Sequence, residues 1–294
     1  MFFFWLFILS LVTVVIVIFL LMRYLKEETD KSNQKNTLLK KQMTSNIAHE
    51  LRTPVTGIRG YLETLLACPD MPQERKNVFI ERAYHQTLRL SELISDMALI
   101  SKLEENSSNF RKEGFRLYDV ACEVFEEFSE KMAANETIAE NRVPMDSVIA
   151  ANRTLVYAIL RNLVENSLKY AGHGASIHLD CFSDGTYYHL KYYDTGHGVP
   201  EEHLERIFER FYRVSEGRTR DDGGSGLGLS IVRNAVAFHG GRIGVANLQG
   251  GGLETKIVAG INMYFKIISN KETFSREKGI QTIKLNAIEI IAKR

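Results

Sequence analysis

The sequence predicts a membrane-anchored protein that combines a helical part with an α/β domain. Three observations support this fold class: an uncharged apolar run at the N-terminus, two stretches with apolar residues at helical spacing, and a second half that alternates strand-like and helical patterns. We expect one transmembrane helix, then a helical hairpin that dimerises as a four-helix bundle, then an α/β sandwich. At roughly 150 residues per domain, the 294 residues predict about two domains.

Composition excludes several classes of function. Lys plus Arg is 37 and Asp plus Glu is 36, so the net charge is +1. Such a balance produces no global field that attracts nucleic acid, and no basic run is interleaved with aromatic residues, so we expect no direct nucleic-acid binding. Cys68, Cys122 and Cys181 lie far apart without metal-ligand spacing, which is typical of reduced thiols.

The apolar run extends from Phe2 to Met22 and contains no charged residue. As a helix it would be roughly 30 Å long, the thickness of a bilayer core. We predict a retained anchor over residues 1–22; a cleaved signal peptide is the alternative, but it would need a basic start and a small-residue cleavage site. Positive charge begins only at Arg23, which predicts a single-pass protein of the plasma or inner membrane with everything after Arg23 in the cytoplasm.

Two helical patterns follow a charged helical linker over residues 23–42. The apolar positions of the first pattern are Leu39, Met43, Ile47, Leu51, Val55, Ile58, Leu62 and Leu65. Those of the second are Phe79, Ala83, Leu90, Leu93, Ile94, Met97, Ile100 and Leu103. Proline residues in the 68–72 break separate them, so residues 43–106 are predicted as a hairpin. Two helices with one apolar stripe each bury it best against a second copy, which predicts a homodimer.

His49 lies off the apolar stripe and is followed by Glu50 and, five residues on, by Pro54. A single helical histidine is ordinarily a solvated side chain. Here Glu50 could accept a hydrogen bond from one ring nitrogen and leave the other as a nucleophile. Pro54 cannot donate to the carbonyl of Glu50, which predicts a loosened turn at this histidine.

The string Ser-Asn-Ile-Ala-His-Glu-Leu-Arg-Thr-Pro over residues 45–54 resembles the phosphoacceptor box of sensor histidine kinases. The resemblance implies that His49 is phosphorylated and that Glu50 is its base partner. It also implies that Thr53 orients water in members with phosphatase activity.

The second half contains short polar motifs. Asn162 and Asn166 are one helical turn apart and share a face, where two amides could contribute to a magnesium and phosphate site. Asp194 ends a strand-like segment and is followed by Gly196 and Gly198, which would allow a flat ring to approach. Each motif has an ordinary alternative, surface amides for the first and a strand-to-turn junction for the second.

A glycine-rich string over residues 223–228 leads directly into a helical pattern, where backbone N–H groups can bind phosphate, although such strings are also plain hinges. The asparagine helix, Asp-x-Gly-x-Gly, the aromatic and basic segment 208–213 and this string together resemble the N, G1, F and G2 boxes of the GHKL-type ATP-binding domain. With the phosphoacceptor box, the resemblance covers roughly residues 40–254. It implies ATP and Mg²⁺ as cofactors.

The resemblance implies a role for each matching residue. Asn166 would be the magnesium ligand, and Asn162 would line the phosphate end. Lys169 would reach phosphate, Tyr170 would pack near the base, and Asp194 would bind the adenine amine. The remaining positions would let the ring approach, form the lid hinge and phosphate cradle, or stabilise charge on the transferring phosphoryl group: Gly196, Gly198, Arg210, Arg213, Gly224, Gly226, Leu227 and Gly228.

An amide at Asn162 favours phosphoryl transfer over hydrolysis. In the ATP-hydrolysing relatives of this domain a glutamate occupies that position and activates water, whereas an amide cannot act as that base. Glu165 is three residues along and predicted on a different face. An ATPase of chaperone or topoisomerase type is therefore disfavoured.

The predicted catalytic domain covers residues 110–254, and residues 255–294 form an atypical tail rich in Ile and Lys. Ile257 and Val258 could still supply part of a final strand. One hypothesis is that the chain from about Lys256 replaces the normal terminus and weakens the catalytic fold; a surface helix or a partner contact is the alternative.

These features predict a sensor histidine kinase that autophosphorylates His49 and passes the phosphoryl group to an aspartate of a separate response regulator, with possible phosphatase activity. The alternative is a catalytically impaired dimeric scaffold or phosphatase of the same pathway that binds nucleotide.

Overall fold

The structure is a computed structural model that describes residues 2–105, 110–185, 187–214, 224–260, 276–277 and 280–281, with the side chains of residues 3–18 and 31–42 left out. The chain divides into two compact units, Met1–Ser91 and Glu92–Arg294.

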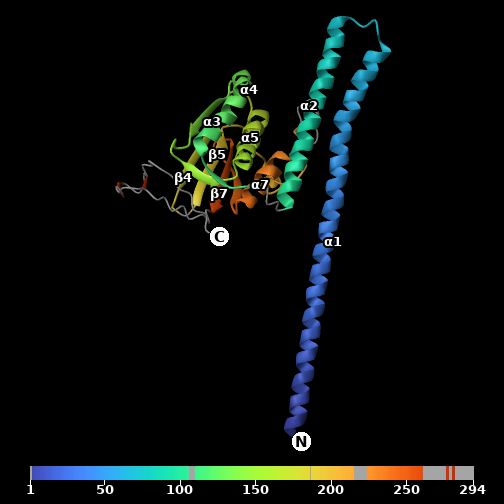
Figure 1. Ribbon diagram of the computed structural model, residues 1–294, viewed down its shortest axis with the longest axis vertical. Helices are drawn as coiled ribbons and strands as arrows, with labels where there is room; N and C mark the ends of the chain where they lie inside the picture. Colours follow the sequence, from blue (N-terminus) through green and yellow to red (C-terminus); the bar gives the residue numbers. More distant parts are fainter. Residues whose placement is uncertain are drawn as a thin grey trace. The chain divides into compact units, whose positions relative to one another are not determined.

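The first unit is built on two helices joined by a short turn (Figure 1). Helix α1 spans Phe2–Ala67, and α2 spans Gln73–Glu104 after the turn. The residues of α2 from Glu92 on belong to the second unit. The turn contains two prolines, which cannot continue a helix, and Met71 N donates to Cys68 O at 3.1 Å. The ring centroids of Tyr61 and Phe79 lie 5.9 Å apart across the pair. The predicted helical hairpin is confirmed.

Helix α1 continues through the stretches predicted as anchor and linker and into the hairpin. Pro54 lies inside it and is buried, and the helix does not end there. Among the residues that the structure describes, no helix is long and apolar enough to cross a membrane. Most of the predicted anchor lies outside this description, because the side chains of residues 3–18 are not included.

The second unit contains a five-stranded sheet of order β2-β4-β5-β7-β6. Its strands are β2 (Ile138–Arg142), β4 (Ser176–Ser183), β5 (Tyr187–Asp194), β7 (Leu253–Gly260) and β6 (Arg242–Asn247). Strands β2 and β4 are parallel and the other neighbours are antiparallel. Two further pairs are separate: β1 (Glu113–Arg116) with β3 (Val148–Ala151), and β8 (Arg276–Glu277) with β9 (Ile280–Gln281).

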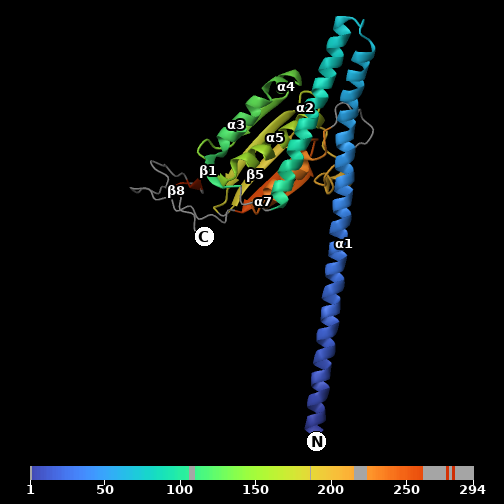
Figure 2. The same ribbon diagram turned by 45° about the vertical axis from the view of Figure 1, so that its right-hand side comes forward.

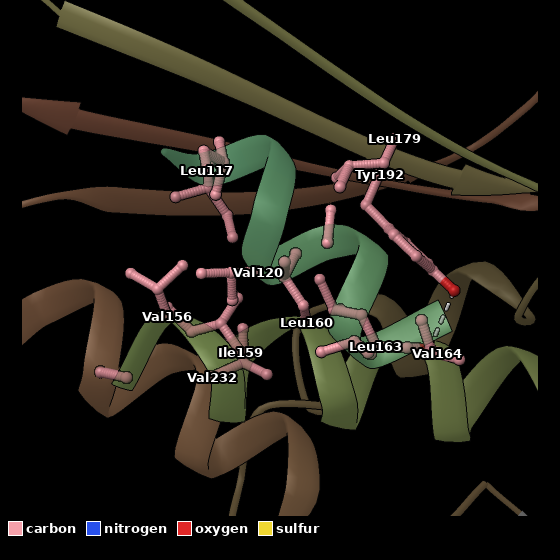
Figure 3. Packing of buried hydrophobic residues seen from close by; sticks show 14 of the residues in the cluster. Leu117, Val120, Val156, Ile159, Leu160, Leu163, Val164, Leu179, Tyr192 and Val232 are labelled. Atoms are coloured by element: carbon pink, nitrogen blue, oxygen red, sulfur yellow. Dashed lines mark hydrogen bonds between the residues drawn. The ribbon is translucent and has the colours of Figure 1, made fainter. Parts of the chain in front are cut away.

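Helices form the second layer of this unit (Figure 2). They are α3 (Leu117–Glu127), α5 (Arg153–Tyr170) and α7 (Gly228–Phe238). The short α4 (Ser129–Ala134) follows α3 and adds Met132 to the core, whereas the short α6 (Glu201–Leu204) buries none of its residues. Val120 of α3, Leu160 of α5 and Val232 of α7 are almost fully buried together with Leu179 and Tyr192 of the sheet (Figure 3). The predicted α/β sandwich is confirmed.

Strand β7 changes the interpretation of the C-terminal segment. It runs six residues past Glu254, the predicted domain end, and pairs with β5 on one side and β6 on the other. Ile257 is only 5% exposed and belongs to the core. The stretch 255–260 is therefore part of the fold, because its inward side chains complete the sheet's buried face. Apart from β8 and β9, the residues after 260 lie outside the described ones.

Candidate functional site

The predicted phosphoacceptor residues lie together on α1. The His49 side chain is 65% exposed, and its Nδ1 is 3.7 Å from Oε1 of Glu50. One turn later, Thr53 Oγ1 donates to the carbonyl oxygen of His49 at 3.3 Å. The carboxylate faces the Nδ1 side of the imidazole, which leaves Nε2 open for reaction.

Helix α5 positions the two asparagines of the predicted nucleotide site. Its N-terminus is capped by Asn152, whose side chain accepts from the backbone N–H of Leu155 at 3.0 Å. Asn162 is buried and donates to Ala158 O at 2.7 Å. Asn166, one turn on, is half-buried, and within the described part of the chain its amide has no hydrogen-bond partner. A metal ion or a phosphate could therefore use that amide oxygen without breaking an existing bond.

Asp194 is fixed at the end of β5. Its carboxylate is 7% exposed and accepts from Ser167 Oγ at 2.7 Å, from Gly196 N at 3.0 Å and from Leu253 N at 3.3 Å. An ionised carboxylate offers about four lone-pair directions, so one acceptor direction remains for an amine. The bonds join α5, the loop after β5 and the start of β7, which holds Asp194 in a defined orientation.

Two of the predicted glycines are required by close contacts. A Cβ at Gly196 would lie 2.3 Å from Cα of Ala171, just after α5, so only glycine allows this approach. Gly226 has φ +69° and a Cβ there would lie 2.8 Å from backbone atoms of Phe211, whose N–H donates to Gly226 O at 2.9 Å. This hydrogen bond joins the middle of the segment between β5 and α7 to its C-terminal end.

The described part of the glycine-rich string, residues 224–228, forms a glycine-rich segment that also lies against α5. The Cβ position of Gly228 is 2.6 Å from Oδ1 of Asn162, and that of Gly224 is 3.6 Å from both Lys169 Nζ and Tyr170 Oη. Leu227 between them is fully buried and precedes the first turn of α7. The structure thus brings the asparagine motif and the glycine string together.

Lys169 is part of a row of charges along α5. Its Nζ donates to Glu165 Oε1 at 2.6 Å, and Arg161 lies 3.5 Å from the other oxygen of the same carboxylate. Burial opposes ionisation of Glu165, but the hydrogen bond from Lys169 and the charges of Lys169 and Arg161 leave its pKa below the ordinary value. Arg161 also pairs with Glu92 of α2 at 3.6 Å and with Glu127 of α3 at 3.3 Å.

The two arginines predicted for phosphoryl stabilisation differ in their surroundings. Arg210 forms an ion pair with Glu104 at the end of α2. Arg213 is half-buried, and the structure places it near the end of the described segment that precedes residue 224. Residues 215–223 of the predicted lid lie outside the described residues.

The residue after Gly198 is held by a side chain that the sequence does not single out. Asn247 at the end of β6 accepts from Val199 N at 2.9 Å and donates to Val199 O at 2.6 Å. Ser167, which donates to Asp194, and Tyr192, which donates to Ser167 at 2.9 Å, were missed as well (Figure 3 shows Tyr192). Helical spacing from Leu163 would have placed Ser167 on the inward face of α5.

Asp96 of α2 provides a test of the charges around Arg161. Burial raises the pKa of Asp96 to about 6, against the attraction of Arg161 and with repulsion from Glu165 and Glu92 adding to the rise. The folded chain therefore keeps a proton up to about pH 6 that the unfolded chain loses near pH 3.8. The stability that this proton gives is fully present below pH 3.8 and is lost as the pH rises through 6.

We therefore expect Asp96→Asn to raise the free energy of unfolding by about 1–2 kcal/mol at pH 8 and to have little effect at pH 4. The measurement is urea unfolding at both pH values. Glu92→Gln, one turn earlier on α2 and 59% exposed, is the control and should show no such pH-dependent gain. An equal gain for Asp96→Asn at both pH values would contradict the assignment.

The residues present fit a nucleotide with magnesium. The Asn166 amide, which has no partner among the described residues, is a suitable oxygen ligand for a hard cation, and Lys169 supplies positive charge next to glycines whose Cα atoms leave room for phosphate. Asp194 is a fixed acceptor next to Gly196, whose missing side chain lets the loop after β5 pack directly on Ala171.

Comparison with known proteins identifies both parts of the chain. Residues 39–106 match the family described as His Kinase A (phospho-acceptor) domain. Residues 151–262 match the family described as Histidine kinase-, DNA gyrase B-, and HSP90-like ATPase. The matched range includes residues 255–260 of β7.

Curated relatives and a solved structure share this order of domains. Sensor histidine kinase WalK of Bacillus subtilis (strain 168) is 29% identical over 218 residues, which cover 72% of this chain and 35% of WalK. Sensor protein IrlS of Burkholderia pseudomallei (strain K96243) is 34% identical over 210 residues, 69% of this chain and 43% of IrlS. This chain thus spans less than half the length of either relative.

The structure of histidine kinase ThkA in complex with response regulator protein TrrA matches with a TM-score of 0.59 and 26% identity, over 80% of this chain and 66% of that chain. With both domain families matched in the same order, the chain belongs to the sensor histidine kinases of two-component systems.

Proposed function

We propose that the protein is an ATP-dependent protein-histidine kinase that phosphorylates its own His49 and then transfers the phosphoryl group to an aspartate of a response regulator. The observation that carries the proposal is the convergence in the second unit: Asn162, Lys169 and Tyr170 of α5 lie against the glycine-rich segment. These motifs are far apart in the sequence, so it is the fold that brings them together.

His49 would act as the nucleophile. Its Nε2 would form a bond to the γ-phosphorus of ATP, the bond from that phosphorus to the leaving oxygen of ADP would break, and the imidazole proton at Nδ1 would be held by Glu50. Mg²⁺ neutralises charge on the phosphates when it is bound. In the second step the phosphoryl group would leave His49 for a carboxylate of the regulator.

Nucleotide binding would be divided among the residues of the second unit. Asp194 would accept from the adenine amine and Tyr170 would pack near the base. Asn166 would be the Mg²⁺ ligand, and Asn162 and Lys169 would face the phosphates. The glycines 224, 226 and 228 would provide backbone N–H groups, and Arg210 and Arg213 would stabilise charge on the transferring group.

Asn166→Ala is expected to weaken binding of Mg·ATP by at least about tenfold, since it removes an amide oxygen without breaking a hydrogen bond of the described structure. Titration of a fluorescent ATP analogue with and without Mg²⁺ measures this. Asn141→Ala, an amide in β2 that bonds Tyr118 O, is the control for amide removal. Equal affinities of wild type and Asn166→Ala with Mg²⁺ would contradict the assignment.

A response regulator is the proposed partner, and Thr53 would orient water for attack on the phosphorylated regulator. Histidine kinase ThkA has been solved in complex with the response regulator protein TrrA, and its likeness to this chain supports the same kind of partner here.

A homodimer is proposed from the hairpin. Apolar side chains of its stripes remain exposed in the single chain, including Val55 at 50%, Leu62 at 47% and Ile94 at 53%. Burial of such a stripe against a second copy would complete a four-helix bundle. The run Phe2–Met22 is proposed as a single anchor in the plasma or inner membrane, with the catalytic part in the cytoplasm.

The test is incubation of the purified full chain with radiolabelled ATP and Mg²⁺. Label that is stable in base and labile in acid, and that a purified receiver domain then removes, is the expected result. Nucleotide binding without any label would instead support the scaffold or phosphatase alternative.

A further inference from the structure

We propose that Glu165 is a positioning residue for nucleotide binding: it holds the ammonium group of Lys169 beside the glycine-rich segment. This inference rests on the proposed function, because it assumes that Lys169 contacts phosphate. Nothing in the proposed chemistry otherwise uses Glu165, which sits between the two asparagines of α5 and next to Asn166.

The first step of the argument is the contact itself. Glu165 Oε1 accepts from Lys169 Nζ at 2.6 Å, which is a short charge-assisted hydrogen bond. Both side chains are partly shielded, with 21% of Glu165 and 35% of Lys169 exposed. A lysine side chain has four rotatable bonds, so a fixed carboxylate at its end removes much of its rotational freedom before any ligand arrives.

The second step is where the ammonium group is held. Lys169 Nζ lies 3.6 Å from the Cβ position of Gly224, so it already lies beside the glycine-rich segment while it is bonded to Glu165. An ammonium group has three N–H donors. The bond to Glu165 uses one, and the other two remain for phosphate oxygens. Binding of phosphate therefore does not require Lys169 to leave its carboxylate.

The third step is the charge of the carboxylate, which would otherwise repel phosphate. Arg161 lies 3.5 Å from Glu165 Oε2, the oxygen that does not bond Lys169. The guanidinium offsets the negative charge of Glu165. Arg161 is itself held by Glu127 of α3 at 3.3 Å and Glu92 of α2 at 3.6 Å, so its position does not depend on Glu165 alone.

The chain offers a matched control in Glu127. Glu127 and Glu165 are both carboxylates that pair with Arg161, but only Glu165 contacts Lys169. Glu127→Gln removes the same charge from the same arginine and leaves the Lys169 contact in place. A general effect of charge on the nucleotide would appear in both variants, whereas a positioning effect appears only in Glu165→Gln.

The experiment measures the affinity of the full chain for Mg·ATP by displacement of a fluorescent analogue, and the KM and kcat of autophosphorylation. We expect Glu165→Gln to raise both Kd and KM by about three- to tenfold with kcat within about twofold, because only the placement of Lys169 is lost. Glu127→Gln should keep the wild-type values. Glu165→Gln should add little further loss in a Lys169→Met background.

The outcomes separate the inference from the function on which it rests. If the wild-type chain binds no nucleotide, the proposed function fails. If it binds and Glu165→Gln binds equally or more tightly, or if Glu127→Gln loses as much affinity, the positioning role is overturned. Thermal melting of each variant without nucleotide shows whether the fold is kept. If Glu165→Gln melts at a lower temperature than the wild type, Glu165→Asp replaces it in the experiment. This variant keeps the charge on a shorter side chain, and we expect an intermediate Kd.

Discussion

Replacement of His49 by alanine is expected to abolish the acid-labile phosphoryl label, a loss of more than about a hundredfold, because the nucleophile itself is removed. The His49 side chain is 65% exposed on α1, so its loss should not cost the fold appreciable stability. Nucleotide affinity should also be unchanged, since the proposed nucleotide residues all belong to the second unit. The measurement is label per chain alongside fluorescent-ATP titration.

His85→Ala is the matched control for this variant. His85 lies on α2 of the same unit, is also 65% exposed, and has a carboxylate of Glu81 3.9 Å from its Nε2. Exposure and a neighbouring acid are thus common to both histidines, whereas the ring nitrogen that faces the acid and the surrounding sequence differ. Label that persists in His49→Ala, or disappears in His85→Ala, would contradict the assignment of the phosphoacceptor.

The second large effect concerns the C-terminal stretch. A chain cut after Glu254 loses six residues of β7, and with them the partners of Leu190 in β5 and Ile243 in β6, both paired with Ile257. The sheet would be divided at an interior strand. We expect the second unit to lose cooperative folding, because the loss is comparable with the about 5–15 kcal/mol that stabilises a domain. Circular dichroism melting and nucleotide titration measure this.

A chain cut after Gly260 is the control, because it keeps all of β7. It should fold cooperatively and bind nucleotide. If the chain cut after Glu254 melted at the same temperature as the longer one, then β7 would not be needed beyond Glu254 and the hypothesis of a disruptive tail from about Lys256 would stand.

Short-range patterns were sufficient to predict much of this fold. The steps of three and four residues predict the helices of the hairpin, and the prolines near residue 70 mark its turn. The link from Asn162 to Gly228 could be predicted only from the order of motifs, since no local pattern states that two segments so far apart will meet. The resemblance to a known domain provided that information.

Other parts of the site could not be predicted from local patterns. Asn247 contacts Val199 because β5 and β6 are both antiparallel to β7, so the two strands finish at the same end of the sheet. The sequence predicts the end of the catalytic domain at Glu254, whereas β7 continues to Gly260. Alternation explains it: Thr255 and Ile257 face the core, whereas Lys256 faces away and pairs with Glu254 at 2.7 Å.

The position of β7 also affects when the protein can fold during synthesis. Ribosomes make the hairpin first, and its contacts are local, so it can form while the rest is being translated. The sheet cannot close until residue 260 has been made, because β7 separates β5 from β6 and is the last of the five strands along the chain. Until then the apolar faces of β4 and β5 have no complete cover. Translation of this last strand is therefore the step at which the nascent protein most needs protection from aggregation.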